Sequence, residues 1–310
     1  MIELRPTTEG DLPQLAGLFA ERFGHPLMPE EWEWKYRRLP GEGRSAVAVD
    51  REGRVLAHAG AVRLPARWHG GEGGIWQLAD FVAAPAGSGL RPPLVELGRW
   101  LLSDLPGPRD APWIFGFPSE RHFRLGERAF GYLPLARIEE RAGDLASVAA
   151  EKGVRAAPTI EASDHCGDWA EAAWEACGVL GVRRTAAFLN WRYHSRPGRY
   201  YRFYRLGSPE AEGFAVFAFV GTEARAAELW LPRGRGLERA LPAIAADLLG
   251  SGLSSWRFWP PPPAMAGALE GLRLAPAGEV FVGCRGRAGA PDPRPAAAGF
   301  HYPMGDWDLA

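Results

Sequence analysis

The sequence of 310 residues has few cysteines, no excess of charge of either sign and no long hydrophobic run. Its three cysteines are an odd number without a CxxC pair, which argues against a disulfide framework or a cysteine-bound metal. A net charge of −1 gives no reason to expect binding to nucleic acid or to an anionic membrane. No apolar run reaches the roughly 18 residues of a membrane span, and the first residues do not read as a secretory signal. We therefore expect a cytoplasmic protein without a metal site.

An internal repeat divides the sequence into two halves. Residues 34–41 and 191–198 share the pattern W-[KR]-Y-x-x-x-P-G and lie 157 residues apart. Residues 85–90 and 232–237 both read P-x-G-x-G-L and lie 147 residues apart. Two motifs in the same order at similar offsets indicate a tandem duplication. The repeat predicts three segments: residues 1–145, residues 146–290 and a C-terminal tail, 291–310.

The hydrophobic pattern of each half predicts a mixed α/β fold. Apolar residues recur with helical spacing after Asp11 and alternate as in strands from 45 to 62. The first half reads as strand, two helices, strand hairpin, strand, glycine loop, helix, strand, helix and strand, and the second half repeats most of this order. The tail is expected to be extended and to pack only through Phe300, Tyr302 and Trp307.

This order resembles the fold of the GNAT acyltransferases. Three segments carry the resemblance: the opening residues 2–12, the strand and loop at 80–89, and the closing residues 113–132. The sequence L-N-W-R-Y at 189–193 is similar to a segment of some tandem GNAT proteins. The resemblance implies two tandem GNAT-like domains, each a mixed, mostly antiparallel sheet flanked by helices. It also implies an N-acetyltransferase that uses acetyl-CoA as co-substrate.

The glycine loop of the first half is the expected site of coenzyme A. Backbone N–H groups of such a loop converge with the positive end of the next helix, which suits a pyrophosphate. The resemblance implies that the pantetheine arm bonds the backbone of the preceding strand. The predicted coenzyme A residues are Phe81, Val82, Gly87, Ser88, Gly89, Leu90 and Arg91.

Both copies of this loop depart from the family pattern [QR]-x-x-G-x-[GA]. In the first copy, Ala86 replaces the polar residue and Arg91 the last small one, and the two prolines that follow lack N–H donors. The second copy keeps Arg233 but has Glu238 at the small position, where its charge would repel pyrophosphate. We favour the first half as the donor site.

Four residues are considered for proton transfer. Asp80 lies on the strand where acids often serve as general base, and a structural aspartate is the alternative. The family often has a tyrosine acid four residues before the glycine that closes the last helix. Here Glu127 occupies that position, so Tyr132 and Glu120 are considered as substitutes. The repeated tryptophan and tyrosine of W-[KR]-Y are interpreted as core residues, because they occur in both halves.

The sequence leaves the acceptor open. We expect a small-molecule or peptide amine, no nucleic-acid or membrane partner, and a monomer or homodimer. One alternative is a degenerate GNAT pair that binds an acyl-CoA or a protein without turnover, which the altered loops favour. Another is a peptidyl or aminoacyl transferase with a donor carried by tRNA, which would need a basic groove.

Overall fold

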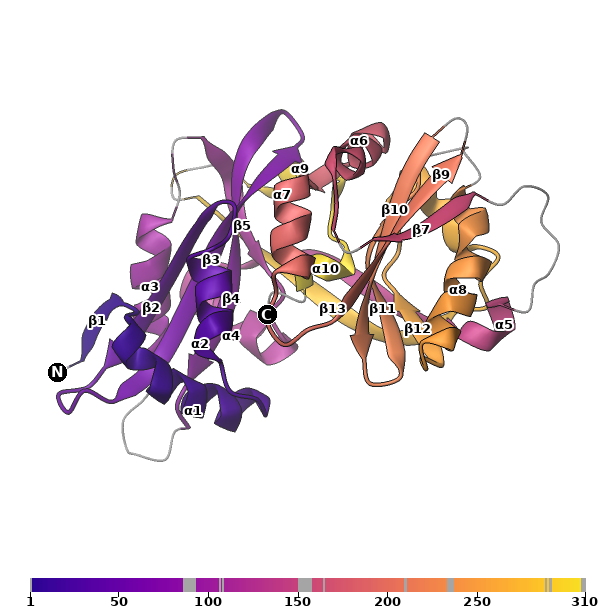
Figure 1. The fold of residues 1–310 in the computed structure, drawn as a ribbon. Helices are drawn as coiled ribbons and strands as arrows, with labels where there is room; N and C mark the ends of the chain where they lie inside the picture. The colour runs from indigo at the N-terminus through magenta and orange to yellow at the C-terminus, as the bar shows by residue number, and fades with distance from the viewer. Residues whose placement is uncertain are drawn as a thin grey trace. The chain divides into compact units, whose positions relative to one another are not determined.

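The computed structural model describes most of the chain as two compact units (Figure 1). Unit 1 is formed by residues 1–136 and 281–298, and unit 2 by residues 137–280 and 299–309. Each unit is a mixed, mostly antiparallel sheet flanked by helices, so the predicted fold class is confirmed. The described residues are 2–85, 93–105, 107, 109–149, 158–163, 165–208, 211–232, 237–287, 289 and 292–307.

Unit 1 has a sheet in the order β1-β2-β3-β4-β5-β13. Its strands β4 and β5 are parallel, and the other neighbouring pairs are antiparallel. The strands are β1 (Glu3–Pro6), β2 (Glu42–Val49), β3 (Val55–Trp68), β4 (Gly71–Ala83), β5 (Asp110–Gly116) and the second half of β13 (Ala275–Gly286).

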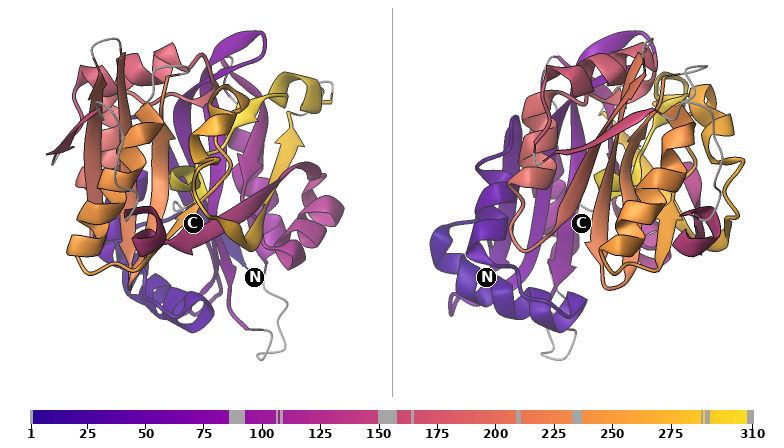
Figure 2. Two further views of the ribbon diagram at one scale, coloured as in Figure 1. Left: turned by 90° about the vertical axis from the view of Figure 1, so that its right-hand side faces the viewer. Right: turned by 45° about the vertical axis from the view of Figure 1, so that its right-hand side comes forward.

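Helices cover both faces of this sheet (Figure 2). Side chains of a strand point alternately to opposite faces. Ala57 and Ala59 of β3 belong to the buried cluster that includes Leu97 and Leu101, whereas His58 between them meets Phe19 on the other face. The helices are α1 (Leu12–Phe23) and α2 (Pro29–Tyr36) on the His58 face, α3 (Leu94–Asp104) on the alanine face, and α4 (Glu120–Phe130) after β5.

Unit 2 repeats this plan, with a sheet in the order β6-β12-β11-β10-β9-β7. Here β11 and β12 are the parallel pair. Its strands are β6 (Leu133–Asp144), β7 (Thr159–Ser163), β9 (Tyr201–Ser208), β10 (Ala211–Val220), β11 (Glu223–Trp230) and β12 (Ser255–Phe258). Its helices are α5 (Leu145–Ala149), α6 (Asp168–Ala176), α7 (Ala186–Leu189) with a π-helical turn (Asn190–His194), and α8 (Leu241–Gly250) after a short 3-10 turn (Leu237–Ala240).

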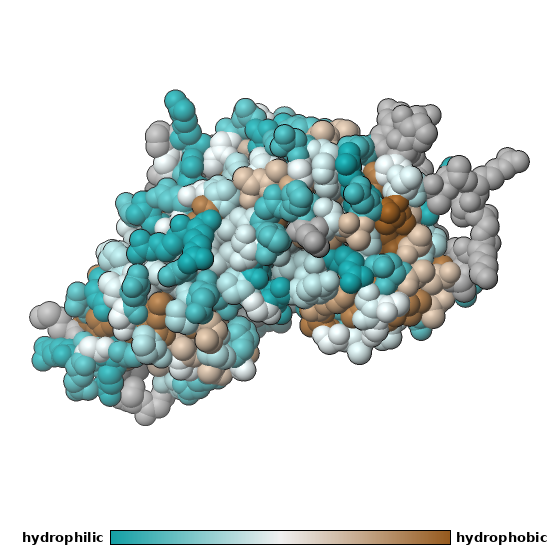
Figure 3. Space-filling model, viewed as in Figure 1, coloured by the Kyte–Doolittle hydropathy of each residue, from teal (hydrophilic) through white to brown (hydrophobic). Residues whose placement is uncertain are grey.

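The remaining elements of unit 2 are short. Strand β8 (Leu180–Val182) pairs in parallel with β14 (Phe300–His301). A 3-10 segment (Pro263–Leu269) follows β12, where unit 1 has the helix α4. Most apolar side chains are internal, and Figure 3 shows a largely polar visible face on which the larger hydrophobic patches lie over unit 2. Among the described residues, no helix combines the length and apolar character needed to cross a membrane.

Each unit completes its sheet with a strand that comes from the other half of the sequence. After α4, the chain continues along β6 into unit 2, where Arg141–Asp144 pair with β12. The last long strand of the second half, β13, pairs through Gly283–Gly286 with β5 of unit 1. The repeat in the sequence places the domain limits at residues 145 and 290, and this division does not predict the exchange of strands.

The expectation of an extended tail is wrong. Residues 294–307 form α9 (Arg294–Ala297), β14 and α10 (Met304–Trp307). Phe300 and Tyr302 are buried as expected, but Met304 and Asp306 are buried as well. The tail is ordered because its polar backbone and its aspartate meet buried arginines, which its proline-rich composition does not reveal.

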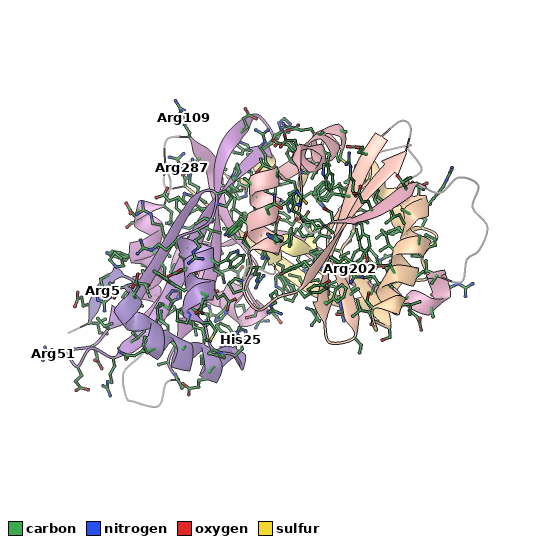
Figure 4. All side chains as sticks on the ribbon, viewed as in Figure 1. Arg5, His25, Arg51, Arg109, Arg202 and Arg287 are labelled. Carbon is green, nitrogen blue, oxygen red and sulfur yellow. The ribbon has the colours of Figure 1, made fainter. Side chains whose placement is uncertain are left out.

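One ion pair fixes the start of unit 1. The guanidinium of Arg5, labelled in Figure 4, donates two hydrogen bonds of 2.7 Å to the carboxylate of Asp11. The backbone N–H and the hydroxyl of Thr8 donate to the same carboxylate, each at 2.8 Å. The hydrogen bonds from Arg5, with those from Thr8, lower the pKa of Asp11 to about 2 despite its burial. Strand β1 is thereby tied to the helix that follows it.

We predict that this pair makes the stability of unit 1 depend on acidic pH. A depressed folded-state pKa stabilises above the unfolded value of about 4 and is lost as the pH falls through about 2. Asp11→Asn should therefore lower the unfolding free energy by about 1–2 kcal/mol at pH 7. Urea unfolding at pH 7 and pH 2.5 measures this, and the variant should differ less from the wild type at the lower pH. An equal difference at both values would contradict the assignment.

The strand exchange gives a second prediction. A fragment of residues 1–145 should not unfold cooperatively, because it lacks β13 with its buried Val282 and Cys284 and leaves the edge of β5 unpaired. Joining residues 275–298 to residues 1–136 through a flexible linker should restore a cooperative urea transition and a near-ultraviolet circular dichroism signal. If the 1–145 fragment alone shows both, the exchanged strand is not needed for folding.

Candidate functional site

The parallel strands β4 and β5 of unit 1 pair over part of their length. Register pairs join Trp76 to Ile114 and Gln77 to Phe115. Strand β5 ends one residue later at Gly116, whereas β4 continues to Ala83. Residues 79–83 therefore extend beyond the end of β5, and we call them the open edge of β4.

A β-bulge lies within the open edge. Across from β3, His58 pairs with Val82 and Gly60 pairs with Ala79, so two residues of β4 stand opposite one of β3. Asp80, the first of these two, has a φ of 57°. This left-handed conformation is uncommon outside glycine, and aspartate tolerates it better than most residues. The bulge bends β4 where β5 has ended.

The bulge leaves one backbone donor directed away from β3. The N–H of Ala84 donates to the carbonyl of Leu56 at 2.9 Å, so these two residues form a hydrogen-bonded pair. In an antiparallel ladder, the residues on either side of such a pair point their N–H and C=O away from the partner strand. The N–H of Ala83 therefore points to the side on which β5 has ended.

Aromatic residues pack beside the open edge on the α3 face. Phe81 meets Phe130 edge to face with ring centroids 6.3 Å apart, and Phe130 meets Tyr132 at 5.5 Å. A Cβ on Gly98 of α3 would lie 2.6 Å from Phe130 and 3.2 Å from Phe81, so the glycine is needed for this close packing. Burial raises the pKa of Tyr132, which stays protonated.

On the other face, the carboxylate of Asp80 is held by two side chains of α2. Lys35 Nζ donates to both carboxylate oxygens at 2.9 and 3.0 Å, and Tyr36 Oη donates at 2.6 Å. The side chains of Lys35 and Asp80 are each 3% exposed. Burial alone would raise the pKa of Asp80, but the charge of Lys35 and the Tyr36 hydrogen bond hold it below its usual value. Asp80 is therefore an ionised, buried and fully engaged carboxylate.

His58 holds the backbone of the bulge. Its Nδ1 lies 2.9 Å from the carbonyl oxygen of Asp80, and its Nε2 lies 2.8 Å from Ser45 Oγ. A carbonyl can only accept, so Nδ1 carries the proton and donates to it. Burial lowers the pKa of His58, which favours its neutral form. The indole N–H of Trp32 also donates to Ser45, at 3.1 Å.

The structure brings some of the predicted site residues together. Asp80, Phe81 and Val82 lie at the bulge, and Tyr132 reaches Phe81 through Phe130. Glu127 is exposed on α4. The predicted loop residues Gly87, Ser88, Gly89, Leu90 and Arg91 lie outside the described residues.

Sequence reasoning missed Lys35, Tyr36 and His58 as partners of the bulge. The signal for the first two was the repeat itself. A core residue common to both halves can be any apolar side chain, but a repeated cation next to a tyrosine indicates a repeated polar partner. His58 gave no comparable signal, because it is one of several isolated histidines.

Unit 2 has the same arrangement of tyrosine, carboxylate and bulge. A register shift lies between Val216 and Phe217 of β10, opposite Ala227 of β11. Glu228 follows at 148 residues after Asp80, and Tyr193 lies 157 residues after Tyr36. Tyr193 Oη donates to Glu228 Oε1 at 2.5 Å. The repeat seen in the sequence therefore corresponds to a repeated polar contact.

A backbone donor near the bulge is bonded to a side chain in unit 2. Leu231, which lies 147 residues after Ala84, donates its N–H to Met265 Sδ at 3.0 Å. Met265 Sδ also accepts from the thiol of Cys177 at 3.9 Å, and its side chain is buried. The four prolines at 260–263 lead into the 3-10 segment that carries it. In unit 1 the corresponding N–H, that of Ala84, bonds the carbonyl of Leu56 on β3 instead.

Solved structures share this architecture. A conserved protein from Enterococcus faecalis V583, described as a probable N-acyltransferase, has a TM-score of 0.68 and 13% identity over 92% of this chain and 73% of its own. A GCN5-related N-acetyltransferase from Anabaena variabilis ATCC 29413 has a TM-score of 0.67 and 14% identity over 92% and 72%. A tandem GNAT protein from the clavulanic acid pathway has a TM-score of 0.62 and 12% identity over 94% and 100%.

The chain has the GNAT fold. The resemblance read from the sequence is thereby confirmed for the architecture, which all three structures share with this chain over more than nine-tenths of its length. No protein-family model and no curated protein matches the sequence. At 12–14% identity, these structures establish the GNAT fold and not the reaction or its substrates.

The contacts of Asp80 predict a large effect on stability. Asp80→Asn keeps a residue that tolerates the left-handed backbone but leaves the Lys35 ammonium buried without its counter-charge. The unfolding free energy should fall by about 3–5 kcal/mol. The double variant Lys35→Met/Asp80→Asn should recover part of this loss, because it removes the uncompensated charge. Urea unfolding of the wild type, both single variants and the double variant gives the coupling energy. Additive effects of the two substitutions would contradict a direct ion pair.

Proposed function

We propose that unit 1 binds acetyl-CoA and that the protein transfers the acetyl group to an amine. The observation that carries this proposal is the open edge of β4. It presents the Ala83 N–H, directed away from β3, immediately after the bulge. A pantetheine arm is an extended chain with two amides, and such a chain can lie along a strand edge as a further strand does.

The chemistry of the open edge fits a neutral amide chain. The carboxylate of Asp80 is turned toward Lys35 and Tyr36, so its charge is compensated away from the open edge. Phe81, Phe130 and Tyr132 supply an apolar wall on the α3 face. The loop between β4 and α3 would then hold the pyrophosphate, with Arg91 as its cation. This role of the loop is an expectation from the sequence.

Acetyl-CoA supplies an activated thioester: the neutral amine attacks its carbonyl carbon, the C–S bond breaks as the C–N bond forms, and coenzyme A leaves as a thiol that carries the proton lost by the amine. The residues of this chain would bind the pantetheine, orient the thioester beside the bulge and exclude water from it. A backbone N–H at the open edge is suited to stabilise the developing oxyanion. We assign Asp80 to the structural alternative, because Lys35 and Tyr36 already occupy its carboxylate.

A contact seen only in the structure favours unit 1 over unit 2 as the acetyl-CoA site. In unit 2, Met265 Sδ accepts from the N–H of Leu231, the residue that follows the counterpart of Ala83. The buried thioether therefore lies against the end of the strand along which an acyl-CoA would have to bond. Three of the similar solved structures are N-acyl- or N-acetyltransferases by description, and one is a tandem GNAT protein described without acetyl-CoA. The acceptor that we propose is a small-molecule or peptide amine of the cytoplasm.

Replacing Ala83 by proline tests the donor site. Proline removes the N–H that points away from β3 and leaves the ladder to β3 intact, so the fold should survive. Affinity for coenzyme A, measured by titration calorimetry, should fall by about tenfold or more, because a hydrogen bond is lost and the ring enters the path of the pantetheine. Met265→Leu is the matched control in unit 2 and should leave the affinity unchanged.

Each other outcome has a definite meaning. Normal binding by Ala83→Pro would remove the donor site from the open edge of β4 and leave unit 2 as the alternative. Absence of binding by the wild type would refute the proposal and favour a non-enzymatic pair. Binding without release of free thiol from acetyl-CoA, over a panel of small amines and peptides, would favour an acyl-CoA-binding module.

A further inference from the structure

Unit 2 contains a cluster of charged side chains with no exposed surface. Arg184, Arg192, Glu228 and Asp306 are each 0% exposed. Arg192 occupies the repeat position of Lys35, and Glu228 lies one residue after the repeat position of Asp80. Their contacts differ from those in unit 1. Buried charges persist only where partners compensate them. The identity of those partners therefore shows what the cluster is built to hold.

The cluster holds the C-terminal segment of the chain, residues 299–307. Arg192 donates from Nε and Nη2 to the carbonyl oxygen of Gly305 at 3.1 and 2.7 Å. Arg184 donates from Nη2 to Asp306 Oδ1 at 2.7 Å and from Nε to both oxygens of Glu228 at 3.1 Å. In unit 1, by contrast, Lys35 bonds the carboxylate of the bulge directly. Arginine at this position reaches a peptide carbonyl instead.

Within these four residues, the charges balance only when the segment is in place. Without it, the two guanidinium groups of Arg184 and Arg192 share the cluster with one carboxylate, that of Glu228. The carboxylate of Asp306 supplies the second negative charge. The part of the cluster that belongs to residues 137–280 therefore has the charge and the donors of a site for a carboxylate next to a peptide carbonyl.

The shape of the site is as specific as its charge. A Cβ on Gly305 would lie 1.9 Å from Tyr193 Oη, 2.9 Å from the carbonyl oxygen of Ala227 and 3.0 Å from Glu228 Oε1. Two of these three atoms belong to the bulge of β11 or to its partner tyrosine. Aromatic contacts flank the glycine: His301 meets Trp230 with ring centroids 5.6 Å apart, and Trp307 meets Trp259 at 6.1 Å. A glycine followed by an aspartate is what these surfaces accommodate.

We propose that unit 2 is a peptide-binding site that recognises a glycine–aspartate step, and that residues 299–307 occupy it as an internal ligand. The ligand chemistry is that of an acidic peptide with a glycine before the aspartate and an aromatic residue after it. The segment of a second copy of this chain has the same chemistry. The proposal does not depend on acyl transfer by unit 1.

Cutting the tether tests this proposal without altering the site. Ala298 and Gly299 are both exposed, so a protease recognition sequence can be inserted between them. After cleavage, a fluorescent synthetic peptide of residues 299–310 should replace the cut segment, as followed by fluorescence anisotropy. The uncut protein should bind at least about tenfold less of the same peptide, because a tethered segment competes at an effective concentration of about 1 mM.

Peptide variants test the recognition. The Asp306→Asn peptide should bind at least tenfold more weakly than the native peptide, and the Gly305→Ala peptide should not compete with it. A scrambled peptide of the same composition is the control. Equal binding of all these peptides would overturn the proposal, since it would indicate apolar contact without recognition of the glycine and the aspartate.

The stability of the cut protein is measured alongside. If the near-ultraviolet circular dichroism signal of unit 2 stays native after cleavage and the native peptide does not enter, the proposal fails. If the signal is lost, the native peptide must restore it and the Asp306→Asn peptide must not. Failure of the native peptide to restore the signal would likewise overturn the proposal, because residues 299–307 would then be ordinary core.

Discussion

The left-handed backbone of Asp80 is the constraint on which the site in unit 1 depends. An extra residue in β4 turns the Asp80 side chain toward α2, where Lys35 and Tyr36 donate hydrogen bonds to it. His58 donates a hydrogen bond to the backbone carbonyl of Asp80. Buried ion pairs contribute little net stability, because desolvation offsets most of their attraction. Their effect here is geometric. They select one conformation of the bulge and so determine the direction of the Ala83 N–H.

The two units contain the same kind of β-bulge in different surroundings. Both have a bulge on the strand before the parallel partner, a carboxylate beside it and a tyrosine that donates to that carboxylate. Unit 1 leaves the next N–H directed toward the place where β5 has ended. Unit 2 bonds the N–H one position further along the strand, that of Leu231, to a methionine and packs a glycine of the chain's own tail against the bulge. Where unit 1 has Lys35, unit 2 has Arg192, which bonds the carbonyl of Gly305, and Arg184 bonds Asp306 beside it.

Local pattern was sufficient to predict much of the fold and little of the site. The alternation of apolar and polar residues in β2 and β3 and the apolar stripe of α1 are local signals. The internal repeat let each half be checked against the other. The exchange of β6 and β13 could not be predicted, since any apolar strand can pair with any exposed edge and the choice depends on distant parts of the chain. The partners of Asp80 are 44 and 45 residues away in sequence, so no spacing rule connects them. The ordered tail was missed because proline and glycine dominate its composition.

The strand exchange has a consequence for synthesis of the protein on the ribosome. Strand β5 leaves the ribosome about 170 residues before the part of β13 that covers it. At bacterial or eukaryotic rates of synthesis this is a delay of roughly 10–30 s. During that time the first half exposes an unpaired parallel-sheet edge, which is a template for pairing with other nascent chains. The order of strands in the finished molecule therefore leaves this edge open to wrong pairing until nearly the whole second half has been made.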